Sequence, residues 1–111
     1  MRTIWLVLAG LAVPAAAGAQ DAALVARGEN VYVAQKCSVC HSVAGKGNQK
    51  GPLDDVGVRL SAEEIRLWMV DPVTMTAKTK AVRKPPMKAY AHIPKEELDA
   101  LVAYMQSLKK K

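Results

Sequence analysis

Apolar residues recur every three or four positions in three stretches of the chain, which is the period of an amphipathic helix. The first stretch runs from about residue 22 to residue 35, and the third follows Pro94. The second opens at Ser61 and stops near Asp71, and Glu64 completes a capping box three residues after Ser61. No stretch shows the period of two that a half-buried strand requires. We therefore expect an all-α domain with three main helices.

Two long segments separate these helices. Residues 45–57 and 72–93 are rich in Gly, Pro or Lys and are expected to be loops. The second segment is about 20 residues long, and loops of that length in a compact domain usually have a function. We therefore look for functional residues in residues 72–93 first.

The first 19 residues have the pattern of a secretory signal peptide. A positive start, Met1-Arg2-Thr3, precedes an apolar run without charges, and Ala17-Gly18-Ala19 is a small-x-small triplet. A helix that spans a membrane needs about 20 apolar residues, and this run is shorter. An uncleaved N-terminal anchor is the alternative. We expect cleavage after Ala19, a single mature domain of residues 20–111, and a periplasmic location.

The chain is small and basic. It has 111 residues, no Phe, and 16 Lys and Arg against 10 Asp and Glu, a formal net charge of +6. So short a chain forms a thin core, and such domains usually need a disulfide, a metal or a cofactor. An exported basic protein is a poor candidate for nucleic-acid binding. Its charge favours partner proteins with acidic surfaces, or is simply a solvated basic face.

The run Cys37-Ser38-Val39-Cys40-His41 is a C-x-x-C-H motif, the signature of covalent c-type haem attachment. In a helical turn, positions i, i+3 and i+4 share one face, so two thiols and an imidazole can meet one porphyrin. We expect one haem c, bound as thioethers to Cys37 and Cys40, with His41 as a ligand of its iron.

Three other kinds of site could also use two cysteines at this spacing. A thiol–disulfide redox site needs a βαβ context, which the chain lacks. A structural zinc site needs four ligands, and beyond the motif only His92 is available among Cys and His. A structural disulfide between Cys37 and Cys40 would close a very short loop.

Met87 is the expected second axial ligand of the iron. It lies in the long segment before the last helix, directly after Pro85-Pro86. The two prolines stiffen the backbone that carries the Met87 side chain. Met75 and a bis-His arrangement with His92 are the alternatives. Met/His ligation raises the reduction potential and leaves no open position for a substrate. We therefore expect an electron carrier and no enzyme activity.

In this order, the motifs resemble the monohaem class I cytochromes c of bacteria, over essentially all of residues 20–111. The resemblance implies the cytochrome c fold, with long loops wrapped around one haem. It also implies that Gly28 and Tyr32 of the first helix cross the last helix, where the small Gly28 permits a close approach. The Gly51-Pro52 pair follows the haem motif as it does in the family.

The resemblance also implies three residues with supporting roles. The carbonyl of the proline at the position of Pro52 accepts a hydrogen bond from the ligand imidazole, which fixes the ring. Arg59 and Trp68 are placed to hydrogen-bond the haem propionates. Their alternatives are a solvated arginine and a core tryptophan.

Three functions follow from these features. The first is a periplasmic carrier between a dehydrogenase or respiratory complex and a terminal oxidase or reductase. It would have redox proteins as partners, no small-molecule substrate, and contact with the membrane only through a partner complex. The second is a dedicated haem subunit of one periplasmic dehydrogenase. The third is a haem enzyme or gas sensor whose sixth iron position is open.

Overall fold

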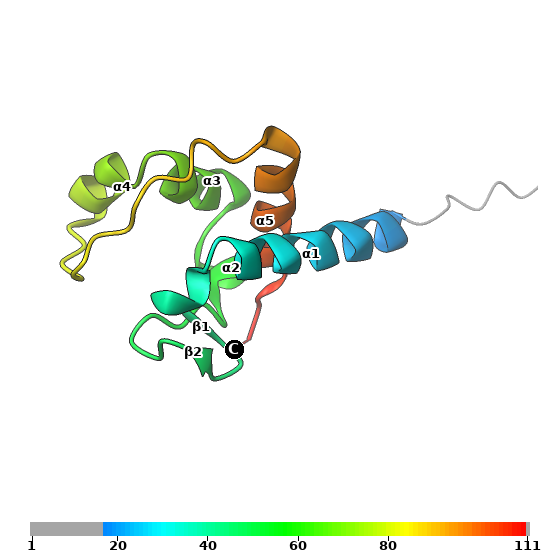
Figure 1. The fold of residues 1–111 in the computed structure, drawn as a ribbon, viewed down its shortest axis with the longest axis horizontal. Coiled ribbons are helices and arrows are strands. Elements are labelled where there is room, and N and C mark those ends of the chain that lie inside the picture. Colours follow the sequence, from blue (N-terminus) through cyan, green and yellow to red (C-terminus); the bar gives the residue numbers. More distant parts are fainter. Residues whose placement is uncertain (1–16, 111) are drawn as a thin grey trace, which may run out of the picture.

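The computed structural model describes residues 17–110, and side chains from Ala22 onward. These residues form five α-helices, one 3-10 turn and a short hairpin, so the expected all-α class is confirmed (Figure 1). In chain order the elements are α1 (Ala17–Ala34), η1 (Cys37–Val39), β1 (Ser42–Val43), β2 (Lys46–Gly47), α2 (Val56–Arg59), α3 (Ala62–Val70), α4 (Pro72–Thr79) and α5 (Lys95–Ser107).

The first helix begins earlier than its apolar pattern predicts. Helix α1 begins at Ala17, whereas we expected a start near residue 22. Most of the expected signal peptide, residues 1–16, lies outside the described residues. The expected cleavage site after Ala19 falls in the first turn of α1 and stays a prediction. No helix of the described part is both long and apolar enough to cross a membrane.

Helices α1 and α5 cross and form the main packing contact of the fold (Figure 1). A Cβ on Gly28 would overlap the carbonyl oxygen of Ala100 and would lie 2.7 Å from the Cβ of Tyr104. The rings of Tyr32 and Tyr104 meet edge to face, with centroids 5.6 Å apart. The crossing expected for Gly28 and Tyr32 is therefore confirmed.

Helix α3 begins as its capping box predicts. The Ser61 hydroxyl accepts a hydrogen bond from the Glu64 amide, and the Glu64 carboxylate accepts one from the Ser61 amide, each at 3.1 Å. Two amides that the first turn leaves without a helical partner are thus satisfied. Ile65 and Met69 point into the core one turn apart.

We expected a loop over residues 72–93, and this expectation is wrong for its first part, which forms helix α4. The Asp71 carboxylate accepts a hydrogen bond from the Thr74 amide at 3.3 Å, and Pro72 occupies the first helical position, where proline is favoured. Asp71 therefore ends α3 and starts α4. The helix ends at Lys80, whose backbone is left-handed with φ 56°. Residues 81–94 form no further helix or strand.

The segment expected as a loop over residues 45–57 also contains regular structure. Strands β1 and β2 pair antiparallel, with Ser42 opposite Gly47 and Val43 opposite Lys46. Ala44 and Gly45 make the turn with positive φ. These strands have two residues each, too few for an alternating pattern to be recognised.

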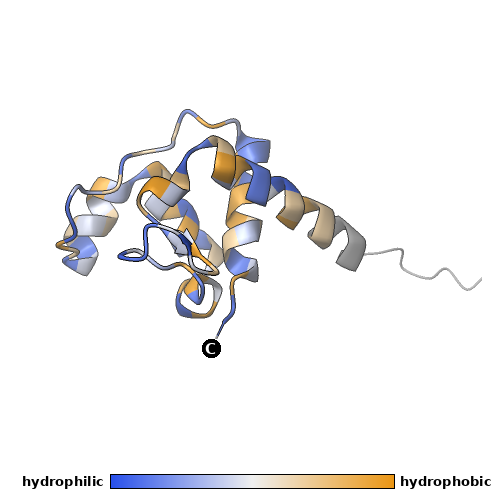
Figure 2. Cartoon of the chain, turned by 60° about the horizontal axis from the view of Figure 1, so that its bottom comes forward, coloured by the Kyte–Doolittle hydropathy of each residue, from blue (hydrophilic) through white to orange (hydrophobic). Residues whose placement is uncertain are grey.

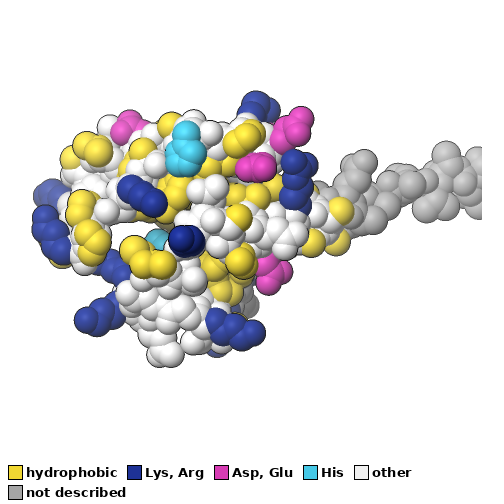
Figure 3. All heavy atoms as spheres, in the orientation of Figure 1, with side chains coloured by type: hydrophobic (Ala, Val, Ile, Leu, Met, Phe, Trp, Pro, Cys, Tyr) yellow, Lys and Arg dark blue, Asp and Glu magenta, His cyan; other side chains and the backbone are white. Residues whose placement is uncertain are grey.

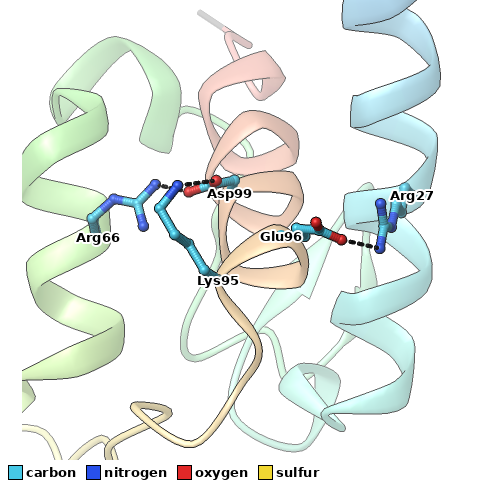
Figure 4. A network of polar contacts seen from close by, with 5 residues as sticks. All are labelled: Arg27, Arg66, Lys95, Glu96 and Asp99. Atoms are coloured by element: carbon cyan, nitrogen blue, oxygen red, sulfur yellow. Dashed lines mark hydrogen bonds and ion pairs between the residues drawn. The ribbon is translucent and has the colours of Figure 1, made fainter.

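Ion pairs connect α5 to its neighbours on both sides (Figure 4). Arg66 of α3 donates to the Asp99 carboxylate, which also accepts from Lys95 at 3.3 Å. On the other side, Arg27 of α1 lies 3.8 Å from the Glu96 carboxylate. Hydrophobic segments lie along the packed helices, whereas the connecting loops are largely hydrophilic (Figure 2). The core therefore sits between α1, α3 and α5.

Candidate functional site

The C-x-x-C-H motif forms a single tight turn directly after α1. Lys36 is left-handed with φ 57° and redirects the chain, so that η1 begins at Cys37. The amides of Cys40 and His41 both donate to the Cys37 carbonyl, at 3.1 and 2.9 Å. The two cysteines and the histidine are thus wound into one turn, as their spacing predicts.

Both cysteines of this turn are free thiols. Cys37 is buried and Cys40 half-buried. Burial raises the pKa of the Cys37 thiol to about 11, so it is protonated at neutral pH. The alternative of a structural disulfide finds no support in this geometry.

The His41 ring is held by one hydrogen bond. Its Nδ1 lies 3.0 Å from the carbonyl oxygen of Gly51. Because a carbonyl can only accept, Nδ1 carries the proton, and the lone pair of the neutral ring is on Nε2. Burial lowers the pKa of His41; the bond to Gly51 opposes this, and the positive charge of Arg83 adds to it. The ring therefore offers a neutral Nε2 as a metal ligand.

The acceptor of this bond differs from the residue that the resemblance implies. The Gly51 carbonyl also accepts from the Ser42 amide at 3.1 Å, and Ser42 forms a parallel bridge with Pro52. This pairing turns the Gly51 carbonyl toward His41, so the expectation for the Pro52 carbonyl is wrong in this structure. Pro52 itself is exposed next to the acceptor.

The segment after α4 is anchored at two residues, Arg83 and Tyr90. A Cβ on Gly51 would overlap the Arg83 guanidinium, so this side chain lies over Gly51. Tyr90 is buried, and its pKa is raised by burial and then by the neighbouring thiols of Cys37 and Cys40. The Tyr90 amide donates to the Met69 carbonyl at 2.6 Å, which fixes the end of the segment to α3.

Met87 lies between these two anchors, Arg83 and Tyr90. Its side chain is half-buried and packs against the core cluster. Met75 is buried in α4, and His92 is exposed. The structure thus places Met87 against the core cluster that includes Cys37, while its role as a ligand stays a prediction.

Arg59 and Trp68 lie on the elements that follow. Arg59 ends α2, and its Nε donates to the Asp55 carboxylate at 2.9 Å, with both side chains about half exposed. Trp68 is half-buried in α3. The roles expected for them toward haem propionates stay predictions.

Gly51, Arg83 and Tyr90 lie at this site and were not among the site residues predicted from the sequence. Gly51 could have been suspected because it precedes Pro52, but the direction of its carbonyl depends on the bridge to Ser42. In the sequence, Arg83 was recognised only as one of several basic residues. Contacts between distant segments have no local sequence signal.

The donor set fits a covalently bound haem. Two neighbouring thiols can each form a thioether, and an imidazole with a free Nε2 follows in the same turn. The space-filling view shows an opening between the segment after α4 and the rest of the molecule (Figure 3).

Within the described residues, no group of three or more His, Cys, Asp or Glu is arranged to hold a metal ion, so a zinc site is unsupported.

Comparison with known proteins agrees with this chemistry. The family model for cytochrome c matches residues 25–109. Cytochrome c oxidase subunit 2 of Alkalihalophilus pseudofirmus is 30% identical over 95 residues, which cover 78% of this chain and 26% of that protein. The chain thus spans about a quarter of the length of the curated relative it matches. No solved structure matches. With its C-x-x-C-H turn and its helical fold, the chain belongs to the cytochrome c family, which binds haem c covalently and uses it in electron transfer.

Proposed function

We propose that the chain is a periplasmic carrier of single electrons, in which His41 and Met87 would bind the iron of one haem c. The observation that carries the proposal is that Met87 packs on the core cluster that includes Cys37 of the C-x-x-C-H turn. Anchors on both sides of Met87, at Gly51 and at Met69, hold its segment in place.

His41 contributes orientation as well as a ligand atom. Its hydrogen bond to the Gly51 carbonyl fixes the ring plane, selects Nε2 for iron, and increases the basicity of that nitrogen. When bound, haem c supplies the one-electron couple. The chain supplies the position and the electrostatics of that couple.

In this proposal, Met87 would supply the second protein ligand of the iron. Pro85 and Pro86 restrict the backbone before it, and its side chain already packs on the core. With thioether and imidazole both bound, no position stays open for a substrate. The chain therefore transfers electrons without bond chemistry of its own and is not an enzyme.

Basic side chains support an acidic redox partner. Residues 72–94 contain five basic residues and no Asp or Glu: Lys78, Lys80, Arg83, Lys84 and Lys88. Basic side chains gather at the end of the molecule that carries α4 and the segment after it (Figure 3). Opposite charge on a partner accelerates encounter. The similarity to an oxidase subunit supports a terminal oxidase as one acceptor.

An optical spectrum of the exported, purified holoprotein tests this function. We expect cleavage after Ala19, the added mass of one haem, and in the oxidised form the weak red band of methionine-bound iron. Met87→Leu should abolish that band, lower the reduction potential and permit carbon monoxide to bind. Met75→Leu is the matched control, a volume-conserving change at a buried methionine that costs below about 1.5 kcal/mol.

Two results would contradict the proposal. A red band that persists in Met87→Leu and disappears in Met75→Leu would assign the ligand to α4. A wild-type protein that lacks the band and binds carbon monoxide rapidly would favour the haem enzyme or gas sensor.

A dedicated haem subunit is the second candidate, because the curated relative is itself a subunit of a larger enzyme. Gel filtration of a native extract separates the two candidates. A carrier elutes at its own mass, whereas a dedicated subunit elutes with its enzyme.

A further inference from the structure

Arg83 lies beside Gly51, the residue whose carbonyl accepts a hydrogen bond from His41. A Cβ on Gly51 would overlap Nη1 of Arg83 and would lie 2.9 Å from its Cζ; it would also overlap the Cys40 carbonyl oxygen. The guanidinium therefore fills the space that the missing Gly51 side chain leaves. Arg83 belongs to the segment after α4, so only the tertiary fold brings it there.

The same residue, Gly51, carries the carbonyl that accepts from His41 Nδ1. The Arg83 guanidinium thus lies against the residue whose carbonyl orients the imidazole of His41. A positive charge at this place opposes the extra positive charge of ferric iron and therefore favours the ferrous state.

Among the residues that the structure describes, no carboxylate forms an ion pair with Arg83. The acidic residues closest in sequence are Asp71 and Glu96, outside the segment after α4.

We propose that Arg83 is a positioning residue for electron transfer, whose guanidinium over Gly51 raises the reduction potential of the His41-bound iron. The proposal rests on His41 as iron ligand and extends the function proposed above to the residue that sets its potential. It requires neither Met87 as ligand nor a particular partner.

The test is the midpoint potential of three holoprotein variants, measured by spectroelectrochemistry at low ionic strength. In Arg83→Gln, the reduced-to-oxidised ratio at a fixed applied potential should fall roughly three- to tenfold, where tenfold corresponds to about 59 mV for one electron. Arg83→Lys keeps the charge and should retain most of the wild-type potential. Lys84→Gln is the matched control, because it removes the adjacent exposed charge and should shift the ratio less than half as much.

A structural readout accompanies the potential. The Nδ1 proton of His41 should shift in the NMR spectrum of the reduced Arg83→Gln protein and stay unchanged in Lys84→Gln. Equal potential shifts in Arg83→Gln and Lys84→Gln, or no shift in Arg83→Gln, would overturn the proposal. A wild type without the red band would contradict Met87 as ligand and leave the comparison of Arg83 variants valid.

Discussion

Gly28 and Gly51 each leave room for a neighbour that a side chain would displace. At Gly28 the neighbour is the backbone of α5, and at Gly51 it is the Arg83 guanidinium together with the Cys40 carbonyl. Backbone cannot move aside as a flexible side chain can, so the contact of Gly28 with the α5 backbone permits little adjustment. The close approach of α1 and α5 therefore depends on this one residue.

Gly28→Ala should destabilise the protein by about 1–3 kcal/mol, because the added methyl overlaps Ala100 and Tyr104. Chemical denaturation followed by circular dichroism measures the loss. Asn30→Ala on the same helix is exposed and should be neutral or stabilising by up to about 0.5 kcal/mol. If Gly28→Ala were as stable as Asn30→Ala, the crossing would be looser than the structure has it.

At the scale of elements, helix ends explain both what was predicted and what was missed. The capping box of Ser61 and Glu64 has a strict spacing and predicted the start of α3 correctly. Asp71-Pro72 was interpreted only as a stop. Because an acidic cap followed by proline equally starts a helix, the same two residues also begin α4.

At the end of α4, replacing a lysine by glycine should change the stability in opposite directions at two positions. Lys80→Gly should be neutral or stabilising by up to about 1 kcal/mol, because φ 56° is strained for lysine and free for glycine. Lys78→Gly, inside the same helix, should destabilise by about 1 kcal/mol. Thermal unfolding of both variants measures the contrast, and equal losses would refute the left-handed end of α4.

At the scale of the whole molecule, α5 is the element on which the others converge. It packs on α1 through Gly28 and is tied to α3 through Arg66 and Asp99. The hydrogen bonds from Arg66 and then Lys95 hold the pKa of the Asp99 carboxyl below its usual 3.8. A carboxyl whose pKa is lowered on folding stabilises the protein above its unfolded pKa, and that stabilisation is lost as pH falls through the folded value.

The difference in unfolding free energy between wild type and Asp99→Asn should therefore be constant at neutral pH and shrink below about pH 4. Urea titrations at a series of pH values measure it. In an Arg66→Gln background the pH-dependent part should become smaller, because the first of the two donors is gone. A difference that did not change with pH would show that Asp99 acts only through packing.

The sequence by itself determined the chemistry of the haem motif, because Cys37, Cys40 and His41 act within one turn, and local spacing decides which side chains share a face. It also indicated the three main helices and the crossing at Gly28. The haem motif and the helices depend on residues a few positions apart. The crossing at Gly28 was predicted from the resemblance to a known family.

Only the tertiary structure decided which groups lie next to His41 and Gly51. Whether Gly51 or Pro52 accepts from His41 depends on the bridge to Ser42, and the place of Arg83 depends on how the segment after α4 returns across the molecule. Hydrogen bonds and charges between distant segments depend on the path of the backbone through space, which no local pattern encodes.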